Sequence, residues 1–296
     1  MKRIMAALTG ELPMTDFVKF TYAPGQYWLF GLFFKLFGPS LLLERLIWVI
    51  MRALVTAMTY LVSRFMVPKR FVFIPVVMAM VMACVPYKTL YPLLTVLNLL
   101  ALFIYIEKKN KVWLLISGAL AGFTLWFRED IGIFLIITAF LCFFVQHFSV
   151  PTFRVFPLKI RLTAQLKQII RKQGLFLSMS ILAFLPLVIY YGINGKARTL
   201  VWELFIGGPL SYISRKAKVS FHFPNIRELF QIPLDWDVVF LWFPVFLFIF
   251  IFFLLAYRLV RQHKLTDHNL YVFATLLLAV LTFNQTYQRA IFERLL

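Results

Sequence analysis

Three consecutive charged residues, Arg128, Glu129 and Asp130, lie within LWFREDIG, the segment that runs from Leu125 to Gly132. A guanidinium presents a fork of donors that matches phosphate oxygens, so Arg128 could bind a phosphate group. Glu129 and Asp130 could position an acceptor molecule, bind a divalent ion or simply orient Arg128. The alternative is structural, because Arg128 could pair with either carboxylate or extend toward lipid headgroups.

The composition of the chain limits where such a charged segment can lie. Of the 296 residues, 62% are hydrophobic and only 15% are charged, which excludes an ordinary soluble domain. The apolar residues form blocks that are apolar on all sides and long enough to cross a membrane. They therefore predict an all-α, polytopic transmembrane helical bundle and not a membrane barrel. Because an unpaired charge costs about 2.5–3.5 kcal/mol at the centre of a spanning helix, we expect the LWFREDIG corner at a membrane rim.

We predict about eight spans in a single domain that covers residues 1–296, since no flexible linker or internal repeat interrupts the chain. Cys84 and Cys142 both lie in apolar runs and are interpreted as buried small side chains, with no metal site indicated. The predicted spans are Leu41–Met66, Phe71–Val85, Leu90–Ile106, Val112–Phe127, Ile131–Phe148, Leu175–Gly192, Val238–Tyr257 and Asn269–Phe283.

The net charge of +19 lies mostly in short loops, as the positive-inside rule predicts, so it does not indicate a nucleic-acid partner. One alternate set of loops is rich in Lys and Arg and is predicted to be cytoplasmic. The other set is poor in basic residues and is predicted to lie outside, together with residues 1–40, the long loop 193–237 and the LWFREDIG corner. The basic set contains Arg64, Lys69, Arg70, Lys108, Lys109, Lys111, Arg154, Lys159, Arg161, Lys167, Arg171, Lys172, Arg258, Arg261 and Lys264.

The sequence also allows a prediction for each of three segments that lie outside the spans. An outer location for residues 1–40 requires a preceding span, because the apolar stretch after Met1 is too short for a signal peptide. We therefore expect that a span is missing ahead of this chain. Tyr27–Phe37 is too short to cross a bilayer and is predicted to be an interfacial helix on the outer side. Residues 149–174 are predicted to be a cytoplasmic, amphipathic basic loop. It includes an amphipathic helix on anionic lipid, because apolar residues recur there at helical spacing: Leu158, Leu162, Leu166, Ile169 and Ile170.

Two segments of the chain resemble a known family. YAPGQYWLFGLFFKLFGPSLLLERL and ISGALAGFTLWFREDIG are similar to two motifs of the GT-C superfamily, and more narrowly of the bacterial protein-mannosyltransferase and aminoarabinose-transferase-like glycosyltransferases. The resemblance implies a GT-C-like fold in a bacterial inner membrane. It implies an enzyme that transfers a sugar from a polyprenyl-phosphate carrier, at the outer face, to a lipid, protein or polysaccharide acceptor. Relatives carry a first span and a catalytic acidic motif ahead of a stretch like GELPMTDF. Both are missing here, so we expect little or no activity from residues 1–296 alone, and the catalytic residue stays unknown.

The resemblance also suggests roles for individual residues. Arg128 and Arg45 match basic positions of the two motifs, and Lys88 is the only charge in its predicted outer loop. These three are the predicted contacts of the donor phosphate. Glu129 and Asp130 are candidates for the acceptor or for a divalent cation. The predicted sugar contacts are the outer-side polar residues Tyr22, Gln26, Tyr87 and Tyr91.

Two other functions fit the same pattern. In a transporter or flippase for lipid-linked sugars, the rim charges would form a gate, although such proteins tend to show broken midplane helices or internal repeats, which this sequence lacks. The chain could also be a non-catalytic partner subunit.

Overall fold

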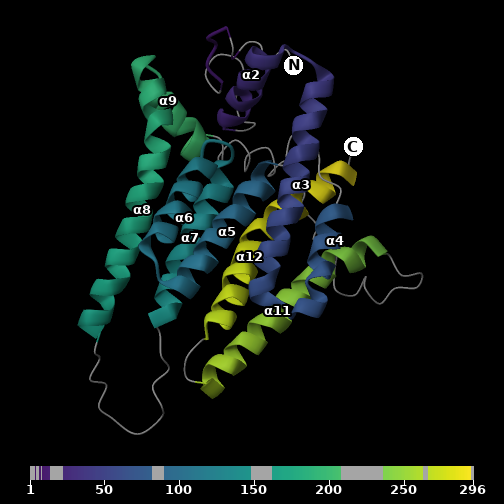
Figure 1. Ribbon diagram of the computed structural model, residues 1–296, viewed down its shortest axis with the longest axis vertical. Coiled ribbons are helices and arrows are strands. Elements are labelled where there is room, and N and C mark those ends of the chain that lie inside the picture. The colour runs from purple at the N-terminus through teal and green to yellow at the C-terminus, as the bar shows by residue number, and fades with distance from the viewer. Residues whose placement is uncertain are drawn as a thin grey trace.

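A computed structural model shows an all-helical chain in the part that it describes, with no strand there (Figure 1). It describes residues 4, 7, 9–13, 23–81, 90–147, 162–207, 236–262 and 266–294, and gives the backbone alone for 147, 162–166, 236–241, 259–262 and 283–294. The helices are α2 (Gly25–Phe37), α3 (Leu41–Met66), a 3₁₀ turn η1 (Lys69–Phe71), α4 (Phe73–Val81), α5 (Leu90–Lys108), α6 (Lys111–Thr124), α7 (Glu129–His147), α8 (Leu162–Ile193), α9 (Ala197–Trp202), a π-turn η3 (Glu203–Gly207), α11 (Trp236–Gln262) and α12 (Asp267–Arg294).

Each predicted span overlaps one of these helices, but among the described residues only four helices are long and apolar enough to cross a membrane: Leu41–Met66, Leu90–Lys108, Glu129–Gln146 and Lys167–Ile193. Lys111–Thr124, Trp242–Arg258 and Asp267–Thr282 are shorter apolar helices. The chain therefore has the features of a helical membrane protein. The α3 helix has the predicted bounds because Ser40 caps its start, where the Ser40 side chain accepts a bond from the Leu42 N–H, and the helix ends just before Pro68.

The centre of the bundle is built by α5, α6, α7 and α8 (Figure 1). Close approach of α6 to α8 depends on two glycines. A Cβ at Gly118 would lie 2.5 Å from the Phe176 carbonyl oxygen, and one at Gly122 would collide with the Ser180 carbonyl. The Ser180 hydroxyl donates across the same contact to the Gly118 carbonyl at 2.9 Å. Small residues spaced in this way let two helix backbones touch, which is how helices associate in membranes.

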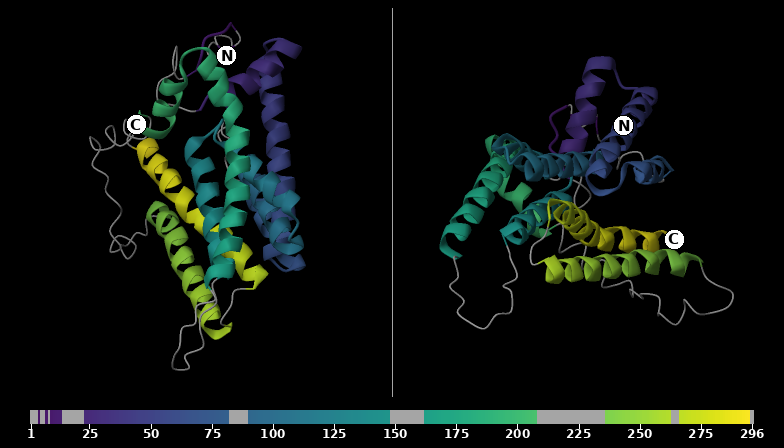
Figure 2. Two further views of the ribbon diagram at one scale, coloured as in Figure 1. Left: turned by 90° about the vertical axis from the view of Figure 1, so that its left-hand side faces the viewer. Right: turned by 60° about the horizontal axis from the view of Figure 1, so that its bottom comes forward.

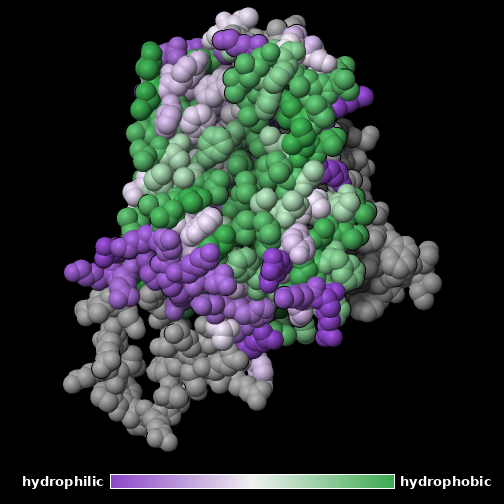
Figure 3. Space-filling model, viewed as in Figure 1, coloured by the Kyte–Doolittle hydropathy of each residue, from purple (hydrophilic) through white to green (hydrophobic). Residues whose placement is uncertain are grey.

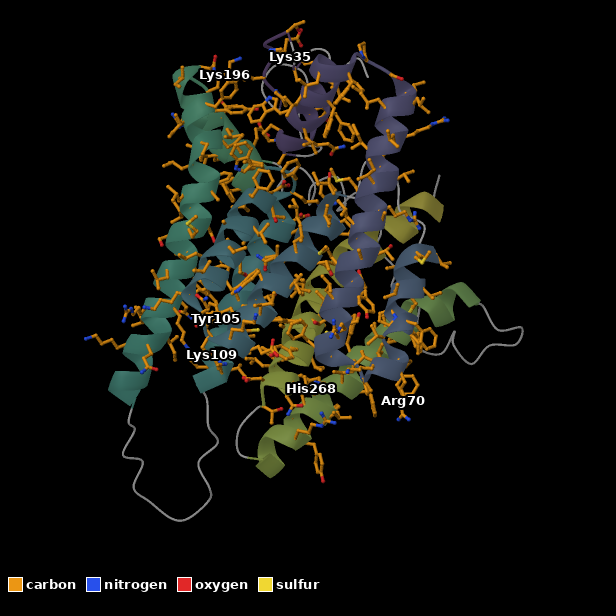
Figure 4. All side chains as sticks on the ribbon, viewed as in Figure 1. Lys35, Arg70, Tyr105, Lys109, Lys196 and His268 are labelled. Atoms are coloured by element: carbon orange, nitrogen blue, oxygen red, sulfur yellow. The ribbon has the colours of Figure 1, made fainter. Side chains whose placement is uncertain are left out.

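The two ends of the bundle differ in polarity. Figure 3 shows a hydrophobic surface above a band of hydrophilic residues, and Figure 4 places Arg70, Lys109 and His268 at the end with this band. Lys35 of α2 and Lys196, just before α9, lie at the opposite end. Two of the predicted basic loops, those that contain Arg70 and Lys109, therefore lie at the same end of the bundle. On the side of the bundle, α12 packs against both α7 and α11 (Figure 2).

The structure differs from the predicted layout in the segment 149–174. Helix α8 begins at Leu162, within the predicted amphipathic helix, and continues without a break to Ile193, so the amphipathic segment and the predicted span form one helix. Lys167, Arg171 and Lys172 interrupt an apolar pattern but do not interrupt a helix, because long basic side chains reach out from a helix end. The predicted outer loop 193–237 likewise begins with α9 and η3. Helix α4 covers only Phe73–Val81 of the predicted span Phe71–Val85, whose end lies outside the described residues.

Candidate functional site

The LWFREDIG corner is a tight turn between α6 and α7. Helix α6 ends at Thr124, and the Thr124 carbonyl accepts bonds from the Phe127 N–H at 3.0 Å and the Arg128 N–H at 2.8 Å. The Arg128 carbonyl then accepts the first bond of α7, from Gly132. Gly132 is required here, since a Cβ at that position would lie 2.5 Å from the Leu125 side chain. The turn thus holds the Arg128 backbone rigidly at the start of α7.

Arg128 and Asp130 form a bidentate ion pair. The Arg128 Nε lies 2.9 Å from Asp130 Oδ1, and Arg128 Nη2 lies 2.9 Å from Oδ2. The Arg128 side chain is only 10% exposed and the Asp130 side chain 28%. Burial lowers the pKa of Arg128, but the hydrogen bonds and charge of Asp130 raise it by more. The guanidinium is therefore always charged, and Asp130 holds it in one orientation.

Two further predicted residues join this pair. The guanidinium carbon of Arg128 lies 5.4 Å from the centre of the Tyr91 ring, and the Tyr91 hydroxyl donates to Gln26 Oε1 at 2.9 Å. Gln26 belongs to α2 and Tyr91 to α5, so three separate elements contribute. The Gly25 N–H also donates to the Trp126 carbonyl at 2.7 Å, and a Cβ at Gly25 would collide with that carbonyl. Helix α2 is thereby fixed against the corner by its first turn.

An aromatic cluster lies beside the polar contacts. The ring of Trp28 lies 6.1 Å from Trp126, 5.0 Å from Tyr190 and 5.9 Å from Tyr191, measured between ring centres. The Trp126 indole N–H donates to the Ala183 carbonyl of α8 at 2.9 Å. The aromatic cluster connects α2, the corner and α8 into one unit. Edge-to-face pairs at these distances each contribute about 0.5–1.5 kcal/mol beyond their burial.

Glu129, the third charged residue of the corner, differs from Asp130 in its hydrogen bonding. Its Oε2 atom is buried and has no hydrogen-bond partner, whereas Asp130 is bonded to Arg128 and to the Ile131 N–H. A buried acceptor without a donor is costly, and a ligand that brings a donor would relieve that cost. Among the described residues, no group of three or more His, Cys, Asp or Glu side chains is placed to hold a metal ion.

The structure thus brings together Gln26, Tyr91, Arg128, Glu129 and Asp130 out of the predicted site residues. Arg45 is exposed on α3, and no described interaction links it to this group. Arg52, two turns further along the same face of α3, donates to the Met80 carbonyl of α4 at 2.6 Å. Lys88, Tyr22 and Tyr87 lie outside the described residues.

Sequence reasoning missed several residues of this region. Trp126 lies in one of the two quoted motifs but was given no role, Trp28 was assigned only to the predicted interfacial helix, and Tyr190 and Tyr191 were interpreted as part of a span. Glu203 was also missed, although its Oε2 atom is buried without a hydrogen-bond partner in the π-turn η3. Trp and Tyr residues near the predicted outer ends of spans are typical of a membrane interface, so their location could be predicted, but their contacts with one another could not.

Comparisons with known proteins add no family assignment. No protein-family model matches this chain, and neither does a curated protein or a solved structure. The class that the fold and composition define is a helical membrane protein with a buried charged corner at one end of its bundle.

Proposed function

We propose that this chain is a membrane glycosyltransferase of the GT-C type, with about eight spans, in a bacterial inner membrane. In this proposal the Arg128 corner binds the headgroup of a polyprenyl-phosphate sugar at the outer face. One observation carries the proposal: the two segments that resemble GT-C motifs, far apart in the sequence, contact each other. They meet through Gly25 and Trp126, and Gln26 is connected through Tyr91 to Arg128.

The charges of the corner define how a phosphate would bind. Asp130 already compensates Arg128, so the phosphate must share the guanidinium with Asp130. Arginine suits this task because its planar group carries several N–H donors in a fixed fork. Tyr91 lies over the same guanidinium and offers an aromatic face and, with Gln26, polar groups for a sugar.

The reaction itself is a displacement at the anomeric carbon. An acceptor oxygen forms the new bond to that carbon while the bond to the phosphate oxygen breaks, and the electron pair leaves with polyprenyl phosphate. A carboxylate must take the acceptor proton. In this arrangement Glu129 supplies the buried oxygen that a hydroxyl of the sugar or acceptor would bond, and Arg128 stabilises the charge on the departing phosphate.

Donor binding tests the proposal without requiring turnover. The full chain in detergent is titrated with labelled undecaprenyl phosphate, and the dissociation constant is compared between wild type and Arg128→Gln. Because a hydrogen-bonded charge contributes about 1.5–3 kcal/mol, we expect binding to weaken by about 10-fold or more. Lys35→Gln is the matched control, since Lys35 is an exposed cation at the same end of the molecule (Figure 4).

Unchanged binding by Arg128→Gln, or an equal loss in Lys35→Gln, would exclude the corner as the phosphate site. A second assay gives vesicles containing the chain a labelled polyprenyl-phosphate sugar. Movement of the label across the vesicle membrane without a new glycosidic bond identifies a flippase. Formation of such a bond supports a transferase but contradicts the expectation that residues 1–296 alone have little or no activity.

A further inference from the structure

Helix α8 contains a proline close to its C-terminal end. Pro186 lies inside the helix Leu162–Ile193. Proline has no N–H, so the Leu182 carbonyl loses the donor that a regular helix would offer it, and the proline ring crowds the preceding turn. Long helices bend at such positions, and in a membrane neighbouring groups have to satisfy the backbone that a proline frees. Pro186 is therefore a candidate hinge in α8.

The LWFREDIG corner supplies a hydrogen-bond donor at this point of α8. The Trp126 indole N–H donates to the Ala183 carbonyl at 2.9 Å, in the turn of α8 that precedes Pro186. Through its own carbonyl Trp126 also accepts the bond from the Gly25 N–H of α2. One residue of the corner thus fastens α2 to the part of α8 that the proline weakens.

The two parts of α8 on either side of the proline are packed in different hydrophobic clusters. Phe176, before the proline, belongs to the central cluster together with residues of α5, α6 and α7. Leu187, directly after the proline, belongs to a smaller cluster that also includes residues of α9 and η3. The buried members of this smaller cluster are Leu12, Ala23, Leu187, Tyr191, Leu200 and Leu204. The C-terminal part of α8 is therefore not anchored in the main core.

Residues 187–207 fold back on themselves beyond the proline, and we call them the 187–207 unit. A tight turn at Gly195, whose φ is +69°, lets the Lys196 N–H bond to the Tyr191 carbonyl at 2.8 Å, and α9 then packs against α8 (Figure 1). The smaller cluster of this unit packs against Trp28 and Trp126, which lie beside the corner. The 187–207 unit thus helps to enclose the corner.

We propose that the 187–207 unit is a cover for the Arg128 corner, which turns about Pro186 and is held closed by the bond from Trp126 to Ala183. The Arg128 side chain is only 10% exposed, so a ligand as large as a phosphate needs a movement of this kind to reach it. The hinge depends on the contacts of α8 and does not depend on the sugar transfer proposed above.

Opening is measured first by the reactivity of a thiol beside the corner. Gln26→Cys is introduced in a Cys84→Ala background, with the fully buried Cys142 retained, and the full chain in detergent reacts with a water-soluble thiol reagent. Trp126→Phe removes the indole donor and keeps an aromatic ring. Since one hydrogen bond contributes about a factor of 5 to an equilibrium, we expect the thiol to react about 5-fold faster. Adding Pro186→Ala should return the rate to that of the parent chain or below it.

Distances between spin labels show which part of α8 moves. One pair of labels joins Leu42 of α3 to Ile193, and the reference pair joins Leu42 to Ile181, which lies before Pro186; all three positions are exposed. A bend of about 20° at the proline moves Ile193 by about 4 Å. With Trp126→Phe we therefore expect the Leu42–Ile193 distance to shift or broaden by about that amount, and the Leu42–Ile181 distance to stay the same.

Pro244→Ala is the matched control, because Pro244 also lies inside a helix, α11, which packs mainly against α12. It should not reverse the effect of Trp126→Phe. Pro186→Ala alone tests the hinge without a change at Trp126, and here the thiol should react more slowly than in the parent chain. The proposal is overturned if Trp126→Phe or Pro186→Ala alone reacts at the parent rate, or if Pro244→Ala reverses the effect as fully as Pro186→Ala. A Leu42–Ile181 shift as large as the Leu42–Ile193 shift would also overturn it, since α8 would then move as a whole.

Discussion

At the scale of single residues, the pair of Arg128 and Asp130 dominates the energetics of the corner. Both side chains are largely removed from solvent and joined by two short bonds. Removing one partner of a buried pair leaves an uncompensated charge and costs about 3–5 kcal/mol. We therefore expect Arg128→Ala and Asp130→Ala each to destabilise the chain by about that amount, measured as the unfolding free energy in a denaturing-detergent titration.

The charge swap Arg128→Asp/Asp130→Arg separates the structural role of this pair from ligand binding. The swapped variant keeps one cation and one anion in contact, so it should regain much of the stability that the single variants lose. Binding of undecaprenyl phosphate should not return, because the cation has moved away from the Tyr91 ring. Recovery of binding together with stability would mean that the corner needs only a paired charge and no defined phosphate contact.

At the scale of helices, the seam between α6 and α8 positions the corner. Gly118 and Gly122 touch the backbone of α8, and Trp126 at the end of the same stripe bonds to Ala183. Gly122→Ala would place a methyl group against the Ser180 carbonyl, and overpacking of this kind costs about 1–3 kcal/mol. We expect a lower unfolding temperature and weaker donor binding, since the displaced α6 carries Trp126 and the corner with it.

Gly174→Ala in α8 is the control for the seam. A Cβ at Gly174 meets nothing within 4 Å, and the residue lies inside a helix. Alanine is preferred to glycine there by about 1 kcal/mol, so this variant should be neutral or slightly more stable. A loss in Gly174→Ala as large as that in Gly122→Ala would show that glycine flexibility matters in these helices and that close packing does not.

The helices themselves could be predicted from the sequence because a membrane span imposes a strong local pattern. The predicted bounds of α3, Leu41–Met66, agree with the structure, in which Ser40 caps the start of the helix and Pro68 follows its end. The amphipathic helix and the span Leu175–Gly192 were predicted separately, because Lys167, Arg171 and Lys172 end an apolar run without ending a helix, and the structure joins them in α8. For the corner, its three charges were visible, but the choice of Asp130 over Glu129 as partner of Arg128 depends on the geometry of the turn. Contacts between distant segments, such as Gly25 with Trp126, leave no periodic signal that a single sequence can reveal.

At the scale of the whole molecule, the positive-inside rule and the proposed donor site require the same orientation of the chain in the membrane. The end with Arg70 and Lys109 is expected in the cytosol by the positive-inside rule, and the end with Lys35 and Lys196 is expected outside (Figure 4). The Arg128 corner belongs with the outer end, because it contacts the first turn of α2, the helix that carries Lys35. A polyprenyl-phosphate sugar at the outer face can reach the corner in this orientation alone.

Cysteine labelling in intact bacteria tests this orientation directly. Lys196→Cys and Lys109→Cys are introduced separately in a Cys84→Ala background; Cys142 is retained because its side chain is fully buried and shielded from the reagent. A membrane-impermeant maleimide should label position 196 in intact cells and position 109 only after the cells are permeabilised. The reverse pattern would place the Arg128 corner in the cytosol. It would exclude an outer-face donor.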